Sequence, residues 1–292
     1  RLCFVTNAWG AQPRAELAAR LLERAGFDGG RVFFTFGGAD ANEHAIKIVR
    51  QALGRPHGVV VARDRSYHGA SYFAMALSGD ARSRGQVDPQ ALFVSHVPPP
   101  YGYRCPFGSR DVEECGRRAA DAVAQRIDEL GAERVAAVIM EPNAGSNGIV
   151  APDGYWPRLR ELTAARSVPL IADEVMSAFG RCGEWFAWQR HGAAARPDMM
   201  TLAKGLTGAA LPLGAVLVSA DLAARLEHVP LQTGLTYCGH PLCCAAGVAA
   251  LQAYAAEGLI ERSRTLGPKL LEALERLRAR HLAIGDVRGG HG

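Results

Sequence analysis

The chain has 292 residues, of which 48% are hydrophobic and 21% are charged, with a formal net charge of +4. This composition is ordinary for a globular protein with a large apolar core. The small basic excess is spread along the chain, and the apolar stretches are short, so neither a nucleic-acid partner nor a membrane-spanning segment is indicated.

Hydrophobic periodicity predicts alternating helices and strands. In chain order, we expect a helix over Arg14–Ala25, a strand over Arg31–Thr35, a helix over Ala41–Leu53, strands over Gly58–Val61 and Ala91–Val97, a helix over Val112–Leu130, a strand over Val135–Met140, a helix over Tyr155–Ala165, strands over Val168–Ala172 and Gly214–Ser219, and helices over Pro241–Ala256 and Leu259–Arg280. Nearly continuous apolar strands separated by helices favour an α/β fold, with a mainly parallel sheet covered on both faces.

The cysteines form neither a CxxC pair nor a cluster with histidine, so no metal site is predicted. The seven are Cys3, Cys105, Cys115, Cys182, Cys238, Cys243 and Cys244. Such residues are typical of reduced packing thiols, and no signal-peptide pattern opens the chain. We therefore expect a cytoplasmic protein.

The first candidate for chemistry is the turn FGGADANE at residues 36–43, which follows a predicted strand and opens a helix. Its glycines permit close approach of a ligand, and a helix N-terminus offers free N–H groups to an anion such as phosphate. The alternative is an ordinary strand-to-helix turn with Asp40 as its N-terminal carboxylate. The spacing fits neither a P-loop nor a dinucleotide-binding fingerprint.

Three further candidates follow along the chain. Tyr67, in the segment SYHG at residues 66–69, can stack on a flat ligand, or can simply pack beneath its loop. Asp173 ends the segment LIAD after a buried strand, where it can hold a pyridinium proton or merely solvate the sheet edge. Lys204 stands among small and apolar residues, which suits an amine with a lowered pKa that attacks an aldehyde, although a surface lysine is the alternative.

Together, in this order, the four features are the parts needed to hold pyridoxal phosphate. The chain resembles the class III (omega) aminotransferases among the fold-type-I pyridoxal-phosphate enzymes. The stretches that carry the resemblance are GGADANE, SYHG, IMEPNAGSNGIVAPDGYWPRLREL, LIADEVMSAFGRCGEWFA, PDMMTLAKGLTGAALPLGAVLVS and GLTYCGHPLCCAA. The pair formed by Asp173 and Lys204, 31 residues apart, is highly specific for this class.

The resemblance implies a role for each matching residue. Lys204 would form the Schiff base with the cofactor and then carry the proton, while Asp173 would keep the ring nitrogen protonated. The remaining implied residues are Val175 and Tyr67 on the two ring faces, Gly38 and Ala39 with backbone N–H groups on the phosphate, Thr236 reaching the phosphate of a neighbouring subunit in a homodimer, and His68 and Glu141 as supports behind the site.

The sequence departs from the family pattern at two positions of the site. Ala39 stands where the family usually carries a hydroxyl, so the backbone and Thr236 must hold the phosphate. The Gly-Gly-Ala-Asp variant resembles the branch that transfers amino groups from taurine or β-alanine to pyruvate. Ser146 replaces a glutamate of the ornithine and GABA branch, which argues against that branch.

The resemblance also predicts the domain organisation. Residues 1–256 would form the cofactor-binding large domain without its N-terminal segment, and residues 257–292 would form a linking helix and the start of a small domain. The expected reaction is transfer of an amino group from an ω-amino acid or simple amine to a 2-oxo acid, with pyruvate as the expected acceptor. The alternatives are an aminomutase of the same fold and a cofactor-binding fragment that catalyses nothing.

Overall fold

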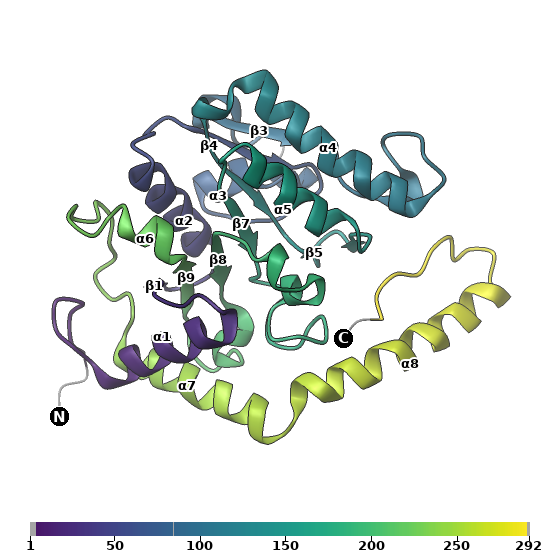
Figure 1. Cartoon of the computed structure of the whole chain (residues 1–292). Helices are drawn as coiled ribbons and strands as arrows, with labels where there is room; N and C mark the ends of the chain where they lie inside the picture. The colour runs from purple at the N-terminus through teal and green to yellow at the C-terminus, as the bar shows by residue number, and fades with distance from the viewer. Residues whose placement is uncertain (1–3, 84, 291–292) are drawn as a thin grey trace.

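A seven-stranded sheet forms the centre of the computed structural model, which describes residues 4–83 and 85–290 (Figure 1). Cys3 and residues 291–292, which the sequence analysis included, lie outside the described residues. The strands follow the spatial order β1 (Arg31–Thr35), β9 (Gly214–Val218), β8 (Met199–Leu202), β7 (Leu170–Asp173), β4 (Val135–Met140), β2 (Val59–Arg63) and β3 (Val94–Val97). A separate two-stranded pair joins β5 (Asn143–Ala144) to β6 (Ile149–Val150).

The directions of the strands place their ends where a site is expected. Strands β3, β2, β4, β7 and β8 are parallel, whereas β9 is antiparallel to both of its neighbours, β8 and β1. Strand β1 therefore points the same way as the parallel five. The carboxyl ends of six strands meet at one edge of the sheet, which is where ligands bind in open α/β sheets.

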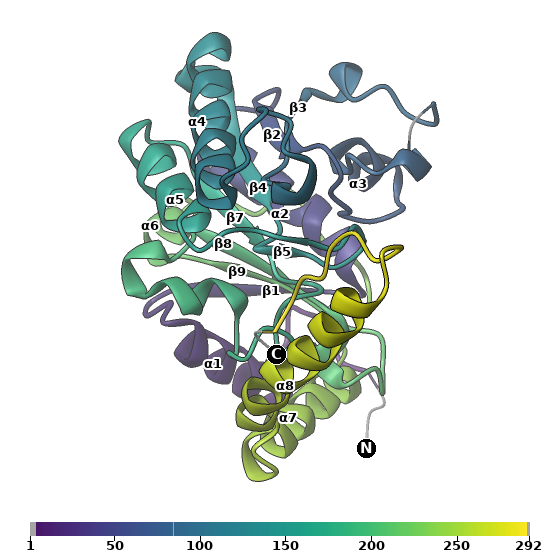
Figure 2. The ribbon, with the colours of Figure 1, turned by 90° about the vertical axis from the view of Figure 1, so that its right-hand side faces the viewer.

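Helices cover both faces of the sheet, because successive residues of each buried strand point to opposite sides. In β4, Val138 and Met140 join one apolar cluster, while Ala137 and Ile139 join the other. The first cluster is covered by α1 (Gln12–Ala25), α4 (Val112–Leu130), α5 (Tyr155–Ala165) and α7 (Pro241–Ala256). The second is covered by α2 (Gly38–Ala52), α3 (Tyr72–Leu77) and α6 (Ala220–Ala224). Helices α4 and α5 lie side by side in both views (Figures 1 and 2).

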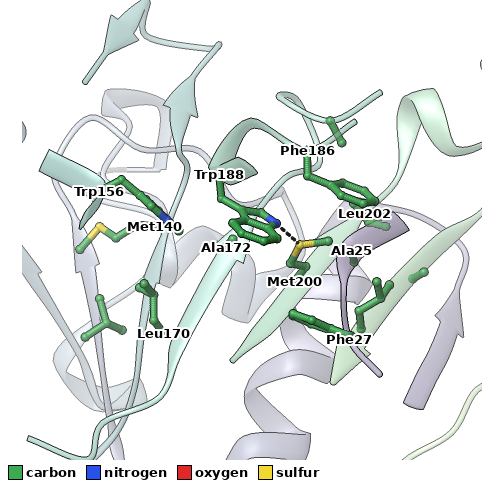
Figure 3. Close-up of a cluster of buried hydrophobic side chains, with 14 of the residues drawn as sticks. Ala25, Phe27, Met140, Trp156, Leu170, Ala172, Phe186, Trp188, Met200 and Leu202 are labelled. Carbon is green, nitrogen blue, oxygen red and sulfur yellow. Dashed lines mark hydrogen bonds between the residues drawn. The ribbon is translucent and has the colours of Figure 1, made fainter. Parts of the chain in front are cut away.

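Large aromatic side chains fill the first cluster, on the face of the sheet covered by α1, α4, α5 and α7 (Figure 3). The indole N–H of Trp188 donates to the sulfur of Met200 at 3.0 Å, and Trp156 donates to the carbonyl of Ala195 at 2.9 Å. Both polar tips are thus satisfied inside an apolar environment. This core supports β7 and β8, the strands that end at Asp173 and just before Lys204.

The last long helix, α8 (Leu259–Arg280), extends away from the sheet, and the chain after it turns back toward the body (Figure 1). No single helix of the described residues is long and apolar enough to span a membrane. Helices α7 and α8 satisfy that test only when taken together across a 60° bend. The predicted domain boundary falls in the short turn between these two helices, and it stays a prediction.

The predicted fold class is confirmed, but several elements differ from expectation. The strand expected over Ala91–Val97 begins only at Val94, because Gln90–Leu92 form a 3-10 turn and Phe93 has a φ of +56°. The helix expected from Ala41 begins at Gly38, with Gly37 rather than Asp40 as its N-cap. Strands expected over Gly58–Val61 and Val168–Ala172 run over the ranges of β2 and β7.

Candidate active site

Eight of the nine predicted site residues line one cavity of about 300 Å³ at the carboxyl edge of the sheet. They are Gly38, Ala39, Tyr67, His68, Glu141, Asp173, Val175 and Lys204. Asp173 is the last residue of β7, and the others follow the ends of β1, β2, β4, β7 or β8. A larger cavity of about 550 Å³ lies beside β1 and α6, lined mostly by apolar side chains and by none of these residues, so it does not compete as the reactive site.

The carboxylate of Asp173 is buried and held by three donors. Its Oδ2 atom accepts from Asn42 Nδ2 and His68 Nδ1, both at 2.7 Å, and its Oδ1 atom accepts from the backbone N–H of Val175 at 3.0 Å. An ionised carboxylate only accepts hydrogen bonds, so Nδ1 is the protonated nitrogen of His68. These contacts fix the carboxylate in one orientation and leave Oδ1 with a single protein donor.

Sequence reasoning assigned no role to Asn42, although it lies within the quoted GGADANE turn. Its amide oxygen accepts from Thr201 Oγ1 at 2.7 Å, and its amide nitrogen donates to the carbonyl of His68 as well as to Asp173. The carbonyl of His68 and the carboxylate of Asp173 can only accept, so the NH₂ group of Asn42 faces them and its oxygen faces Thr201. A polar residue between Ala41 and the apolar face of α2 was the available signal, but its partner on β7 is 131 positions away.

The two adjacent acids at the end of β7 have different surroundings. Asp173 lines the cavity, whereas Glu174 is fully buried and accepts from Ser177 Oγ and from the backbone N–H groups of Ala187 and Trp188. Burial raises the pKa of Glu174 to about 7, against the effect of those donors. Glu174 therefore ties the loop after β7 to the segment carrying Trp188, and it does not reach the cavity.

Glu141 forms a buried ion pair that sequence reasoning missed. Its Oε2 atom accepts from Arg63 Nη2 at 3.2 Å and from the backbone N–H of Tyr67 at 3.3 Å. Burial raises the pKa of Glu141, and the charge of Arg63 opposes that shift. Glu141 thus supports the loop that carries Tyr67 and His68. Nothing in the run VVVAR marks Arg63 as buried, because arginine at a strand end is usually solvated.

Lys204 opens a 3-10 turn (Lys204–Thr207) directly after β8 and has a φ of +42°. This left-handed conformation is costly for a residue with a side chain, and such strain is concentrated at functional sites. Its neighbours Ala203 and Leu206 are buried, as the sequence indicated, but Lys204 itself is exposed. Lys204 thus stands among small and apolar residues, as expected, while its side chain reaches into the open cavity.

The first turn of α2 forms part of the cavity wall. The N–H groups of Gly38 and Ala39 have no acceptor within the helix, since they precede its first complete turn. A Cβ atom at Gly38 would lie 2.7 Å from Val175 Cγ1, so only glycine lets this backbone approach Val175. Asp40 does not cap the helix; its carboxylate accepts from the N–H of Phe36 at 2.7 Å.

Thr236 is the one predicted site residue that lies outside the cavity lining. It is exposed in the segment before α7. The other lining residues are Asn42, Gly69, Ala70, Ser146, Met176 and Ala203. Of these, Ser146 occupies the branch-specific position of the sequence analysis and does lie at the cavity.

The residues present fit pyridoxal phosphate in three respects. A buried carboxylate with an acceptor site to spare suits a protonated ring nitrogen, and helix N–H groups without partners suit a phosphate. An exposed lysine on the same cavity, with no ion pair among the described residues, suits an aldehyde. Val175 and Tyr67 supply an aliphatic and an aromatic surface for a flat ring.

Comparisons with known proteins agree with this fit. The family model described as "Aminotransferase class-III" matches residues 1–292. The putrescine–pyruvate aminotransferase of Pseudomonas aeruginosa is 36% identical over 95% of this chain, and the chain spans 61% of that relative's length.

Solved structures extend the likeness to the fold. An amine transaminase from an uncultivated Pseudomonas species, solved in its PLP-bound form, is 33% identical with a TM-score of 0.92, over 100% of this chain and 68% of that one. The taurine:2-oxoglutarate aminotransferase of Bifidobacterium kashiwanohense, solved with PLP and glutamate, is 34% identical with a TM-score of 0.90, over 100% of this chain and 65% of that one.

Proposed function

Because the chain belongs to the class III aminotransferases, a family that uses pyridoxal phosphate, we propose that it transfers the amino group of an ω-amino acid or simple amine to a 2-oxo acid, with pyruvate as the preferred acceptor. The observation that carries this proposal is the joint placement of Lys204 and Asp173 on one cavity at the carboxyl edge of the sheet. The chain spans about three fifths of the curated relatives that it matches, so the activity is proposed for the full-length protein.

When bound, pyridoxal phosphate supplies an aldehyde that binds amines covalently. Its protonated ring withdraws electrons from the substrate carbon that bears the nitrogen. Asp173 would hold the proton on the ring nitrogen, with Asn42 and His68 fixing its carboxylate. The N–H groups of Gly38 and Ala39 would hold the phosphate. Val175 and Tyr67 would limit the ring to one plane.

Lys204 would have two tasks in this arrangement. Its Nζ atom would hold the cofactor, and as a free amine it would carry a proton from the substrate carbon that bears the nitrogen to the former aldehyde carbon on the other side of that nitrogen. Because Lys204 is exposed to the cavity and has no ion-pair partner within the described residues, its amine is free to move between these two positions.

The substrate class rests on sequence features and on the relatives. Ser146 lines the cavity where the ornithine and GABA branch carries a glutamate, so no carboxylate at this position competes for an arginine that would bind a substrate carboxylate. The relatives' names include both pyruvate and 2-oxoglutarate as acceptors. The proposal of pyruvate follows the Gly-Gly-Ala-Asp turn.

We expect the full-length protein to form alanine from pyruvate with taurine, β-alanine or putrescine as donor, and to react more slowly with 2-oxoglutarate. Chromatographic measurement of both the new amino acid and the donor's carbonyl product checks this. Isomerisation of one compound without use of an acceptor would instead support an aminomutase. If the protein binds the cofactor but forms no product with any donor, the result would support a non-catalytic binding protein.

We further propose that a second copy of this chain completes the site by bringing in Thr236. Helix α7 begins five residues after Thr236 and carries no charged side chain over its 16 residues, although five of them, Leu242, Ala249, Gln252, Ala255 and Ala256, are exposed. A helix that is apolar on every side belongs in an interior. Leu242 and Tyr237, 62% and 57% exposed, extend this apolar surface toward Thr236.

Replacing Leu242 with Glu is expected to shift the protein from dimer toward monomer, because burying an unpaired charge in an apolar contact is strongly unfavourable. Sedimentation velocity across a concentration series measures the shift. The matched control is Val112→Glu, which changes a residue 51% exposed at the start of α4, on the other side of the molecule (Figure 1). An unchanged dimer in the Leu242 variant would contradict the proposed interface.

A further inference from the structure

Two charged residues next to the Tyr67 loop, Arg82 and Asp80, have no part in the proposed reaction. The guanidinium of Arg82 lies over the ring of Tyr67, with its central carbon 4.8 Å from the ring centroid. A cation over an aromatic face is attracted by the ring's quadrupole, and a planar guanidinium also stacks on it. Tyr67 lines the cavity, so whatever fixes its ring also shapes the cavity.

Arg82 is itself held firmly by Asp80. The Nε and Nη2 atoms of Arg82 donate to the two carboxylate oxygens of Asp80 at 2.8 and 3.0 Å, and the backbone N–H of Arg82 donates to Oδ1 at 2.8 Å. Asp80 is almost fully buried, although the Arg82 side chain is 67% exposed. The hydrogen bonds from Arg82 lower the pKa of Asp80 to about 2, so the pair stays charged at every pH in ordinary use.

The same carboxylate also reaches the second loop that borders the cavity. Asn147 Nδ2 donates to Asp80 Oδ2 at 3.2 Å, and Asn147 follows Ser146, which lines the cavity, in the turn between β5 and β6. The segment of Asp80 also runs beside the Tyr67 loop, where Gly79 N–H donates to Ser66 Oγ and Arg65 N–H donates to the carbonyl of Gly79. Asp80 thus connects the two loops that carry Tyr67 and Ser146.

We propose that Arg82, held by Asp80, is a positioning residue that fixes the Tyr67 ring and thereby sets the affinity of the cavity for pyridoxal phosphate. Ion pairs whose cation is exposed to solvent usually add little to stability by themselves. This one differs because its cation is stacked on a ring that borders the cofactor cavity. The inference rests on the proposed function, since it requires the cavity to bind that cofactor.

Arg82→Leu is expected to weaken binding of pyridoxal phosphate about two- to fivefold, which is the range of a cation–π contact at a partly exposed site. Equilibrium dialysis of the full-length apoprotein against the cofactor measures this dissociation constant. Arg82→Lys should recover part of the loss, because it keeps the charge but not the paired hydrogen bonds with Asp80. The thermal midpoint of the apoprotein should stay within a few degrees of wild type in both variants.

The matched control is Arg104→Leu. The guanidinium of Arg104 lies over the ring of Tyr103 at 5.4 Å, but neither residue lines the cofactor cavity, so cofactor affinity should not change. A double-mutant cycle gives the decisive result. If Arg82 acts through Tyr67, the variant carrying both Arg82→Leu and Tyr67→Leu binds no more weakly than Tyr67→Leu alone.

Additive losses in the cycle, or an unchanged affinity in Arg82→Leu, would overturn the inference while leaving the proposed function intact. Equal losses in Arg82→Leu and Arg104→Leu would overturn it as well, because they would indicate a general effect of removing surface charge. A wild-type protein that binds no pyridoxal phosphate would overturn both the inference and the function on which it rests.

Discussion

Lys204→Ala is expected to abolish covalent attachment of pyridoxal phosphate and to lower the turnover number by about 10³-fold or more. Proton transfer by a positioned side chain contributes roughly 10²–10⁴-fold by itself, and this variant also loses the covalent link. The left-handed backbone at Lys204 should tolerate alanine no worse than lysine, so the fold should persist. Borohydride reduction followed by peptide mass spectrometry locates the attached cofactor.

The composition of the chain makes this experiment unusually clear. The sequence contains three lysines, Lys47, Lys204 and Lys269, on α2, after β8 and on α8. Lys47→Ala and Lys269→Ala are therefore the matched controls among the lysines of this chain, and both should keep the label and the activity. Label retained in Lys204→Ala at wild-type yield would show that the assignment of Lys204 is wrong.

Asp173→Asn is expected to leave cofactor attachment at Lys204 intact but to slow a single turnover by roughly 10²-fold or more, because the ring nitrogen loses the carboxylate that keeps it protonated. Rapid-mixing spectroscopy of the loaded enzyme with an amine donor measures that rate. The substitution also turns an NH₂ group toward existing donors, either Val175 N–H or the pair formed by Asn42 and His68. We expect a loss of about 1–3 kcal/mol in the free energy of unfolding.

A control must separate this chemical effect from the loss of stability. Asp198 also accepts from a backbone N–H, that of Leu170 at 2.8 Å, and pairs with Arg160, but it precedes β8 and so lies at the opposite edge of the sheet. Asp198→Asn should lower stability without slowing a single turnover. Single-turnover rates near wild type in Asp173→Asn would refute the role given to this carboxylate.

The sequence predicted regular elements best where the local pattern was long and well bounded. The bounds of α4, α5, α7 and α8 agree with expectation, because each has a clear periodic face or a proline or cap residue at its start. Strand β8 was missed because it has only four residues and the polar Thr201 interrupts its apolar run. Helix α3 has only six residues, which is too short for a periodic signal.

In the candidate site, too, sequence patterns predicted some features, whereas contacts between distant segments could not be predicted. The rule that ligands bind at the carboxyl ends of parallel strands places Asp173 and Lys204 together, and the structure places them on one cavity. The partners of Asp173 were beyond the reach of pattern, since Asn42 and His68 come from distant segments. The burial of Arg63 and the ion pair of Asp80 with Arg82 likewise depend on tertiary contacts. The functional roles of all these residues stay predictions.

The contacts of Asn42 also bear on how the protein folds. This one amide joins α2 to the end of β7, 131 positions away, and to β8, 159 positions away. The entropy lost in closing a loop grows with its length, so such contacts form late, after nearer pairings have shortened the effective distance. Partly folded chains will therefore contain helices and the nearer strand pairs, such as β7 with β8, before they contain the contacts of Asn42 with Asp173 and Thr201. The ability to bind the cofactor should be among the last properties that a refolding chain acquires.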